Sequence, residues 1–362
     1  MSAPELRPTL SRRRLLLSTA AGLVAAGVSS LSGPAIRSAR AAVETKRVII
    51  GVGPDWGTGG HAVVALKKGY LAEEGLSEVE LKQFPAGLVQ LEALAAGGID
   101  VGNPAQAPIF TLRAAGIPII VLASLASYGD SFGLAVRKST NVKKPADLEG
   151  LKIGVLKGTS AELMLDNVMR HYGVDASKVT TIQLKPPEQL SSLATGAIDG
   201  ICVWQPWVYQ ASQKVPIDVL HTGLTSHFPQ NDGEHVKVDY TRGVLTTTER
   251  FARQNPETVA ALVRAYAKAQ AFATAPENFG ETVEIFSDYF NQNADENRII
   301  LAQYRSSIAL DADYQEDMDV IEKFLADTGR LRKDVDLAAM TYPAPLKAID
   351  PGLVTVPASW AP

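Results

Sequence analysis

The order of apolar and polar positions predicts the same run of elements twice along the chain. Short apolar runs are typical of buried strands, and apolar residues spaced three and four apart are typical of helices. These patterns predict strand, helix and strand at 48–52, 61–70 and 79–84, and again at 152–156, 161–172 and 180–184. Two similar units of this kind predict an α/β fold with two lobes that face each other across a cleft.

A repeated ten-residue sequence follows the second strand of each unit. It reads LEALAAGGID at 91–100 and LSSLATGAID at 190–199, and both copies fit L-x-x-L-A-x-G-x-I-D. The Leu and Ala residues fall on one face of a helix, the Gly suits a left-handed helix end, and Ile-Asp opens a strand. Each unit is therefore expected to continue with a helix and a third strand.

The rest of the chain predicts two passages between the lobes and a helical C-terminal part. A strand at 133–136 belongs to the first passage, and 142–151 is a polar connection into the second lobe. A polar segment at 221–238 leads to a returning strand at 240–246. The chain is then expected to be helical from Glu249, with further helices at 281–290, 296–308 and 314–325 and a Pro-rich surface tail after 343.

The start of the chain resembles an export signal. Residues 11–17 read SRRRLLL, an apolar run follows at 15–31, and Ala39-Arg40-Ala41 is a small-x-small cleavage pattern. The paired arginines favour the twin-arginine type. A transmembrane anchor is the alternative, but the run is short and rich in Ala, Gly and Ser. We therefore expect a twin-arginine signal peptide at 1–41 and a mature protein in the periplasm.

Composition limits the partners and the chemistry. Cleavage removes six Arg and one Glu, so the formal net charge falls from −4 to −9, which argues against nucleic acid as a partner. The single cysteine, Cys202, rules out an internal disulfide. Inside the apolar run 201–204 it is either a nucleophile or, as is more common, a small buried hydrophobe. The sequence shows no recognisable cofactor motif and no metal-ligand cluster, so neither is expected.

Turns between strands and helices supply candidate binding groups in the first lobe. Residues 53–60 (GPDWGTGG) come directly after the first strand and are expected to be irregular, with a helix starting at His61. Free backbone N–H groups at a helix start suit an anion or a polar ligand, although a flexible loop is the alternative. Residues 102–106 follow the third strand and are expected to form a second wall, because such strands end at the crevice.

Equivalent turns occur in the second lobe. Thr159 to Glu162 fits the capping box S/T-x-x-E, which fixes a helix start after the strand at 152–156. Trp204 and Trp207 bracket Gln205-Pro206 at another turn from strand to helix. Although Trp is usually a core residue, one of this pair is expected to face the cleft.

Four segments carry a resemblance to a known family. They are GIDVGNPAQAP at 98–108, VRKSTNVKKPADLEGLKIGVLKGTSAE at 136–162, LKPPEQLSSLATGAIDGICVWQPW at 184–207 and ERFARQNPETVAALVRAYAKA at 249–269. The chain resembles periplasmic substrate-binding proteins of ABC transporters in the nitrate, sulfonate, taurine and thiamine-precursor superfamily, and within it the aliphatic-sulfonate binders most closely. Those proteins typically carry Trp-Asp-Pro where this chain has Trp204-Gln205-Pro206. This departure leaves the ligand class open.

The resemblance implies a type II periplasmic-binding fold, with two α/β lobes joined by two hinge crossings and C-terminal helices packed on the first lobe. We expect the first lobe to comprise 42–130 plus 237–362 and the second to comprise 131–236. The resemblance also implies a monomer that closes on a small molecule and delivers it to a membrane permease.

A small organic anion, and among these an aliphatic sulfonate, is the expected ligand. Backbone N–H groups at 57–60 and 159–160 would hold the anionic head, because helix starts favour negative charge. Arg242 would add a charge-assisted bond, unless it serves a salt bridge at the hinge. An organic tail would pack against aromatic side chains, namely Trp56, Tyr128, Phe132 and Trp204. The expected ligand-binding residues are Trp56, Gly57, Thr58, Gly59, His61, Asn103, Ala105, Gln106, Ser131, Gly158, Thr159, Ser160, Trp204, Gln205 and Arg242.

Two alternatives remain open. A thiamine-precursor pyrimidine or another heterocycle would use Asp55, Asp130 and the aromatic walls, through stacking and cation–π contact. An enzyme would resemble the desulfinases or pyrimidine synthases that share this fold, with Cys202 or His61 as its reactive group. Those two residues are expected in different lobes and no Ser-His-Asp order is present, so we expect a binding protein without catalytic residues.

Overall fold

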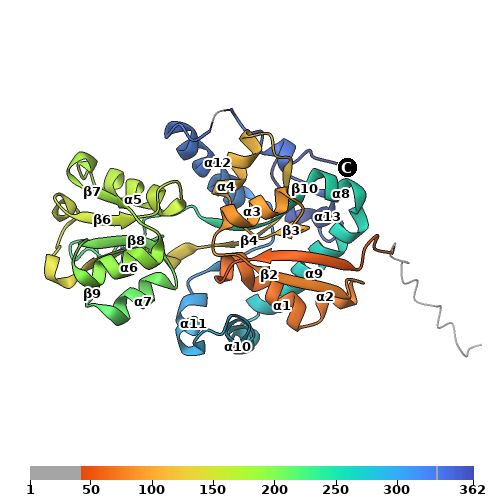
Figure 1. The fold of residues 1–362 in the computed structure, drawn as a ribbon, viewed down its shortest axis with the longest axis horizontal. Helices are drawn as coiled ribbons and strands as arrows, with labels where there is room; N and C mark the ends of the chain where they lie inside the picture. The colour runs from red at the N-terminus through yellow and green to blue at the C-terminus, as the bar shows by residue number, and fades with distance from the viewer. Residues whose placement is uncertain (1–41, 332) are drawn as a thin grey trace, which may run out of the picture. The chain divides into compact units, whose positions relative to one another are not determined.

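The computed structural model describes residues 42–331 and 333–362. The export signal expected at 1–41 lies outside these described residues. The described part forms two α/β lobes, each built on one sheet (Figure 1). Among the described helices, none has the length and apolar character needed to cross a membrane.

The first lobe is built on a six-stranded sheet with the order β11-β4-β10-β3-β1-β2. Its strands are β1 (Arg47–Val52), β2 (Glu78–Gln83), β3 (Val101–Gly102), β4 (Ile119–Ser127), β10 (Arg242–Thr248) and β11 (Arg305–Ser306). β1 is parallel to β2 and β3, whereas β10 is antiparallel to β3 and β4. The apolar run in β1 is explained by burial, since Val48, Ile50 and Val52 are fully buried on one face and Ile49 is half-buried on the other.

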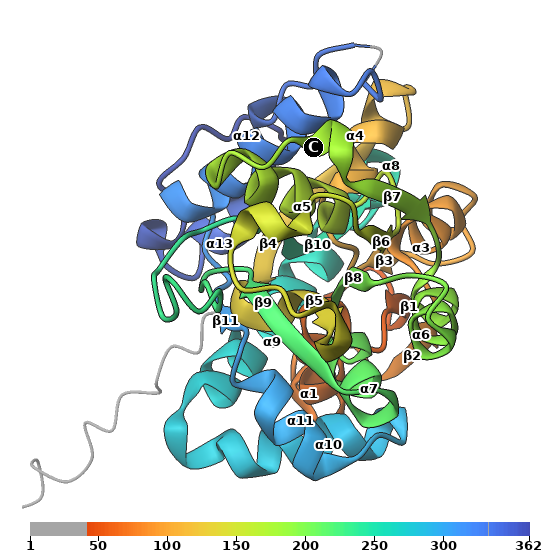
Figure 2. The same cartoon turned by 90° about the vertical axis from the view of Figure 1, so that its left-hand side faces the viewer.

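The second lobe is built on a five-stranded sheet with the order β7-β6-β8-β5-β9 (Figure 2). Its strands are β5 (Phe132–Arg137), β6 (Lys152–Val155), β7 (Thr180–Gln183), β8 (Gly200–Trp204) and β9 (Ile217–Thr222). β6 is parallel to β7 and β8, and β5 is antiparallel to β8 and β9. This order repeats β2-β1-β3-β10-β4 strand by strand. The predicted pair of similar units is therefore confirmed, while the expected lobe boundaries stay a prediction.

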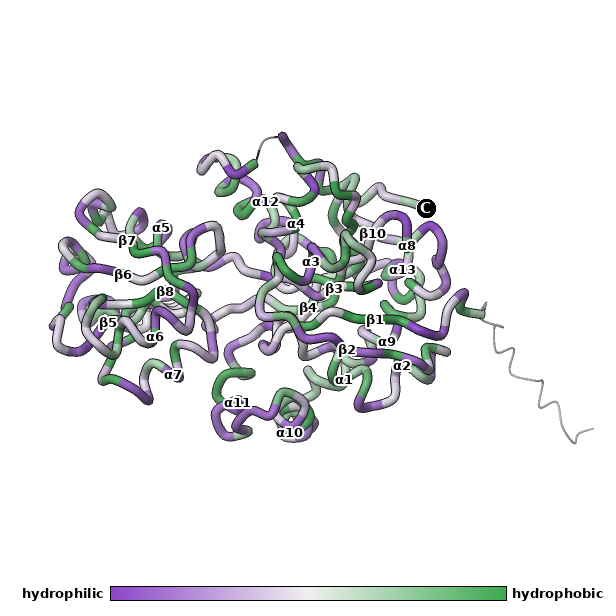
Figure 3. Tube along the Cα trace, viewed as in Figure 1, coloured by the Kyte–Doolittle hydropathy of each residue, from purple (hydrophilic) through white to green (hydrophobic). Residues whose placement is uncertain are grey.

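Helices cover the sheets of both lobes. In the first lobe they are α1 (His61–Lys67), α2 (Tyr70–Glu73), α3 (Gly87–Ala95), α4 (Ala107–Ala114), α8 (Glu249–Gln254), α9 (Pro256–Thr274), α10 (Phe279–Phe290), α11 (Ala294–Leu301), α12 (Ala312–Asp327) and α13 (Ala344–Lys347). In the second they are α5 (Ser160–His171), α6 (Pro186–Thr195) and α7 (Trp207–Lys214). Many hydrophobic residues lie in the strands of both lobes, and many hydrophilic residues lie in the outer loops (Figure 3).

Two crossings connect the lobes, and their backbones are in direct contact. The first contains the short 3-10 turn Gly129–Ser131 between β4 and β5, and the second is the segment 223–241 between β9 and β10. A Cβ atom at Gly223 would lie 1.9 Å from the carbonyl oxygen of Gly129. Only glycine allows this approach, because any side chain at 223 would overlap the neighbouring backbone.

The repeated ten-residue sequence forms the same structure in both lobes. It covers the second half of α3 and of α6 and the turn that follows each helix. Gly97 and Gly196, which occupy the same position of the repeat, have φ angles of 75° and 77°. Both glycines thus provide the left-handed helix end that the sequence predicts.

The aspartate that ends each copy ties the third strand of its lobe to the first. Asp100 Oδ2 accepts a hydrogen bond from Ile49 N, and Asp199 Oδ2 accepts one from Lys152 N, each at 2.8 Å. The backbone N–H groups of the same aspartates donate back to the same two residues. The repeat is therefore explained by sheet assembly in each lobe.

Two local expectations are corrected by the structure. The segment 53–60 is not wholly irregular, because Trp56–Gly60 form one π-helical turn that the Asp55 side chain caps through Thr58 N. The helix expected at 296–308 ends at Leu301 as α11, because Arg305 and Ser306 pair with β4 to form β11.

We expect Asp100→Ala to lower the free energy of unfolding by about 1 kcal/mol, because Ile49 N loses its partly buried acceptor. Chemical denaturation measures this change. Glu92→Ala is the matched control, since Glu92 is an exposed residue of the same repeat copy. Equal losses for the two variants would contradict the assigned role of the repeat.

Candidate functional site

A small cavity lies where the two lobes meet. The first lobe contributes the loop after β1, helices α10 and α11, and Tyr304, and the second contributes the turn after β8. The lining residues are Pro54, Asp55, Trp56, Gln205, Pro206, Phe286, Gln292, Asn297, Ile300, Leu301 and Tyr304. The space inside is about 10 Å³, which is room for one water-sized group. This lining, drawn from the described residues, has one carboxylate and no cationic side chain.

The Asp55 carboxylate organises the loop after β1. Its Oδ1 accepts hydrogen bonds from Thr58 N at 3.1 Å and from the Tyr128 hydroxyl at 2.6 Å, and its Oδ2 accepts one from the Thr58 hydroxyl at 2.6 Å. The Asp55 carbonyl accepts a further bond from Gly59 N at 2.9 Å. The N–H groups of Thr58 and Gly59, expected to hold an anion, are thus engaged by Asp55. Desolvation raises the pKa of Asp55, although these hydrogen bonds oppose it.

Gly57 allows three segments to meet around this carboxylate. A Cβ atom at Gly57 would lie 2.6 Å from the Tyr128 ring. A Cβ atom at Gly243 in β10 would lie 1.9 Å from the carbonyl oxygen of Gly57. The loop after β1, the first crossing and the returning strand are therefore packed with no room for a side chain at either glycine.

The start of α5 also carries a carboxylate of its own. Glu162 Oε2 accepts a hydrogen bond from Gly158 N at 2.7 Å and pairs with Arg330 Nη2 at 2.8 Å. The expected capping box is not formed, because the Thr159 hydroxyl donates to Leu156 O and Glu162 accepts from Gly158 N, not from Thr159 N. This helix start therefore carries a paired carboxylate and guanidinium.

Trp56 is fixed as a wall of the cavity. Its Nε1 donates to Ser306 Oγ at 2.8 Å, and its ring packs against the Phe286 ring with centroids 5.7 Å apart. His61, expected in the site, is buried behind it and pairs with Gln270 through Nε2. Burial lowers the pKa of His61 to about 4, so this residue is neutral at physiological pH.

The expected second wall is used within the fold. Asn103 Nδ2 donates to the Tyr266 hydroxyl at 2.9 Å, and Gln106 Oε1 accepts from Arg242 N at 2.8 Å. Ala105 forms a β-bridge with the returning strand. Ala105 and Gln106 hold the segment after the third strand against β10, Asn103 joins it to α9, and none of the three lines the cavity.

A row of aromatic rings crosses from one lobe to the other. Ring centroids are 5.0 Å apart for Tyr304 and Tyr128, 5.5 Å for Tyr128 and Phe132, and 5.8 Å for Phe132 and Trp204. Three of the aromatic residues expected to pack an organic tail are therefore in contact with one another. They are joined by Tyr304, which the sequence did not single out.

Two expected site residues line the cavity, one from each lobe: Trp56 and Gln205. Gln205 N donates to Ser131 O at 2.8 Å, and Gln205 Oε1 accepts from Tyr209 N at 3.0 Å. The other expected residues lie outside the lining, namely Gly57, Thr58, Gly59, His61, Asn103, Ala105, Gln106, Ser131, Gly158, Thr159, Ser160, Trp204 and Arg242.

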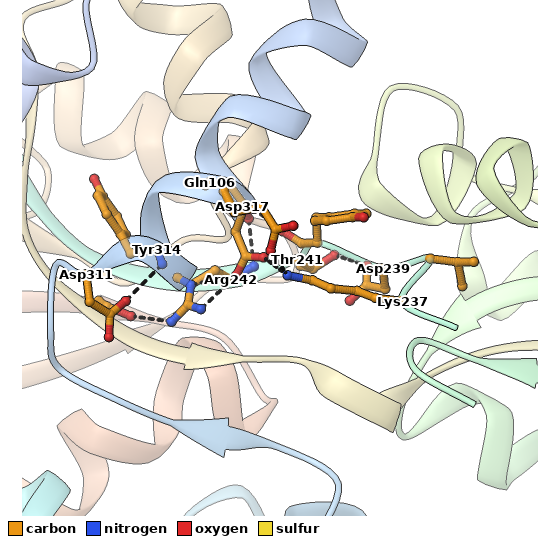
Figure 4. Close-up of polar contacts among 12 residues, drawn as sticks. Gln106, Lys237, Asp239, Thr241, Arg242, Asp311, Tyr314 and Asp317 are labelled. Carbon is orange, nitrogen blue, oxygen red and sulfur yellow. Dashed lines mark hydrogen bonds and ion pairs between the residues drawn. The ribbon is translucent and has the colours of Figure 1, made fainter. Parts of the chain in front are cut away.

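The charge of Arg242 is satisfied inside the fold (Figure 4). Its Nε and Nη2 lie 2.8 and 2.7 Å from Asp317 Oδ2, and its Nη1 donates to Ser124 Oγ at 2.9 Å. Lys237 Nζ approaches the other oxygen of Asp317 at 3.0 Å. Arg242 therefore makes the hinge salt bridge that the sequence left as an alternative.

The part of the lining that comes from α10 and α11 was missed by sequence reasoning. These helices bring Phe286 and Asn297 to the cavity, but their pattern predicts only amphipathic helices. Gln292 joins this hairpin to the loop after β1, because its Nε2 donates to Pro54 O at 2.9 Å and its Oε1 accepts from Asn297 at 3.0 Å. Only tertiary packing reveals this contribution.

Asp239 is a buried carboxylate in the second crossing. Its Oδ1 accepts from the Thr241 hydroxyl, whereas its Oδ2 has no hydrogen-bond partner among the described residues. Burial raises the pKa of Asp239 from 3.8 to about 7. Between these values the folded protein holds a proton that the unfolded chain has released. Stability is therefore expected to fall as the pH rises from about 4 to about 7, and to level off above that.

We expect Asp239→Asn to remove this fall, because the amide keeps an oxygen for Thr241 and cannot ionise. The variant should be more stable than the wild type at pH 8, by about 1.4 kcal/mol for each unit by which the pKa is raised. Urea unfolding across this pH range measures the effect. Asp288→Asn, at an exposed position of α10, is the control. Parallel profiles for the two variants would refute the raised pKa.

Comparisons with known proteins place the chain in a family. A family model described as NMT1/THI5 like matches residues 60–278. The taurine-binding periplasmic protein of Escherichia coli K12 is 29% identical over 217 residues, which cover 59% of this chain and 62% of that protein. The match thus spans less than two thirds of this relative's length.

Solved structures with the same fold include binding proteins and an enzyme. The periplasmic aliphatic sulphonate binding protein SsuA of Escherichia coli has a TM-score of 0.69 at 19% identity, with 83% of this chain and 98% of that chain covered. The desulfurization enzyme DSZB has a TM-score of 0.61 at 18% identity, with 84% and 98% covered. These likenesses confirm the predicted periplasmic-binding fold. By its sequence match over more than half its length, the chain belongs to the NMT1/THI5-like family.

Proposed function

We propose that this protein is the solute-binding component of an ABC importer and closes on a small organic molecule between its lobes. The observation that carries this proposal is the cavity to which both lobes contribute, with Trp56 on one side and Gln205 on the other. A ligand that bridges the two walls would favour the closed arrangement of the lobes, because it contacts both only when they are together. The taurine-binding and aliphatic sulphonate binding relatives are described as periplasmic proteins. Export of this chain to the periplasm is part of the proposal.

An organic sulfonate is the first candidate ligand. The relatives include a taurine-binding protein and an aliphatic sulphonate binding protein. The aromatic lining residues Trp56, Phe286 and Tyr304 suit an organic tail and would offer little to a bare inorganic anion. We therefore rank organic sulfonates above nitrate and sulfate.

A nitrogen heterocycle such as a pyrimidine is the second candidate. The observation that favours it is a carboxylate beside each helix start, where Asp55 accepts from Thr58 N and Glu162 accepts from Gly158 N. A neutral or cationic ring avoids repulsion from these carboxylates and stacks on the aromatic walls. Arg242 is paired with Asp317, and Arg330 is paired with Glu162.

An enzymatic role through Cys202 is not supported by its surroundings. The thiol is fully buried in β8 and donates to Ala161 O at 3.2 Å. Burial raises the pKa of Cys202 well above its ordinary value, so the reactive thiolate is suppressed. We infer that Cys202 is a packing residue of a binding protein.

A thermal-shift panel tests the proposed function. It includes taurine, alkanesulfonates, pyrimidines, nitrate and sulfate at matched ionic strength. A ligand at a hundred times its dissociation constant should stabilise the fold by about 2.7 kcal/mol, and we expect this from an organic sulfonate. A shift with pyrimidines alone would select the second candidate. A panel without any shift, or a shift with inorganic anions alone, would refute the proposed ligand classes.

Cys202→Ser separates a binding protein from an enzyme. The serine hydroxyl can keep the contact with Ala161 O, so we expect the dissociation constant of the panel's ligand to change by less than about twofold. Calorimetric titration of wild type and variant measures this. The proposal would be contradicted if the wild type converted the ligand to a product and the variant did not.

A further inference from the structure

We propose that the hydroxyl groups of Tyr304 and Ser131 form a subsite that binds an amino or ammonium group of the ligand. This inference rests on the proposed function and names the part of the ligand that the cavity recognises.

The two residues are brought together at the first crossing. Tyr304 lies just after α11 and lines the cavity, and Ser131, which lies behind the lining, ends the turn that connects β4 to β5. The preceding residues are in backbone contact, because Asp130 N donates to Gln303 O at 3.3 Å. The Ser131 side chain faces the Tyr304 hydroxyl. Gln205, on the opposite wall, is held to the same turn by its bond to Ser131 O.

Both hydroxyls are buried and face each other. Tyr304 is 8% exposed and Ser131 is 0% exposed, and neither hydroxyl forms a hydrogen bond of full geometry with a described residue, although Ser131 lies close enough to lower the pKa of Tyr304. Other buried tyrosines differ, since Tyr128 donates to Asp55 and Tyr266 is bonded to Asn103. Burying a hydroxyl without a partner is unfavourable, and a native protein keeps such groups where they serve a purpose. A ligand atom that pairs with both hydroxyls would remove this cost.

The surroundings select a hydrogen-bond donor as that atom. The lining of the cavity contains the Asp55 carboxylate and no cationic side chain. Burial, followed by the charges of Asp55 and Asp239, raises the pKa of Tyr304, so its hydroxyl stays protonated and neutral. An oxyanion here would be repelled by the carboxylates, whereas an N–H group would be attracted to them and could donate to both hydroxyl oxygens.

The size of the space agrees with an amino group. About 10 Å³ remains beside Tyr304, enough for one water-sized group and too little for a sulfonate or an aromatic ring. The rest of the ligand would therefore lie along the walls once the lobes have rearranged around it. The subsite would recognise the end of the ligand that carries the amino or ammonium nitrogen.

Calorimetric titration with two matched pairs of probes tests the subsite. One pair is taurine and ethanesulfonate, and the other is an aminopyrimidine and the same pyrimidine without its amino group. We expect wild type to prefer the amino member of the pair that it binds. Tyr304→Phe should weaken binding of that member roughly fivefold, the size of one lost hydrogen bond, and leave the other member within about twofold. Ser131→Ala should show the same selectivity.

The stability of the free protein provides a second readout. Tyr304→Phe removes a hydroxyl that has no partner, so the thermal midpoint of the free protein should stay unchanged or rise. Tyr266→Phe is the matched control, because its buried hydroxyl is bonded to Asn103 and lies outside the lining. This control should lower the midpoint and leave the affinity unchanged.

Three results would overturn the subsite. The first is a Tyr304→Phe variant that loses stability and loses affinity equally for both members of a pair. That result would show that the Tyr304 hydroxyl has a structural role. The second is a wild type that binds ethanesulfonate or the plain pyrimidine as tightly as the amino member, which leaves the proposed function intact. The third is a wild type that binds none of the four probes, which refutes the proposed ligand classes and this subsite together.

Discussion

The structure depends on a packed junction around the Asp55 carboxylate. This one side chain accepts hydrogen bonds from Thr58 in the loop after β1 and from Tyr128 at the first crossing. Gly57 and Gly243 allow the same loop and the returning strand to touch backbone to backbone. One point of contact is thus shared by the loop after β1, the first crossing and the returning strand β10. A side chain at Gly57 or Gly243 would separate these segments, because the packing there leaves no room for one.

This arrangement changes how an anion could be held. The sequence predicts free N–H groups at two helix starts, and such groups ordinarily favour the binding of an anion. In the structure each helix start already has a carboxylate from its own chain, Asp55 in one lobe and Glu162 in the other. The cation that might have compensated, Arg242, is paired with Asp317. In the proposed site, hydroxyl groups and aromatic surface would therefore matter more than a fixed positive charge.

The fold could be predicted from the sequence because its signals are local. Apolar runs mark the strands, and the repeat at 91–100 and 190–199 marks equivalent helix ends in both lobes. Glycines with positive φ and aspartates that bond the first strand are consequences of those few residues alone. The same local signals predicted that the turns after β1 and β8 reach the place where the lobes meet.

The site could be predicted only in part, for the opposite reason. Trp56 and Gln205 follow strand ends, so their position could be predicted, whereas Phe286 and Tyr304 reach the cavity through packing of distant helices. Polar residues near the cleft were expected to serve a ligand, but Asn103, Gln106 and Arg242 find partners inside the fold. No sequence pattern distinguishes a hydrogen-bond donor that is available to a ligand from one that is bonded within the fold.

The most direct test of the account is a crystal structure of the protein with a ligand that stabilises it. The account predicts ligand density between the loop after β1 and the turn after β8, in contact with Trp56, Gln205 and Tyr304. A ligand bound elsewhere would contradict it, for example in the polar groove near Arg47 and Arg250 on the first lobe. Such a result would show that the meeting of the two lobes is not where this protein recognises its solute.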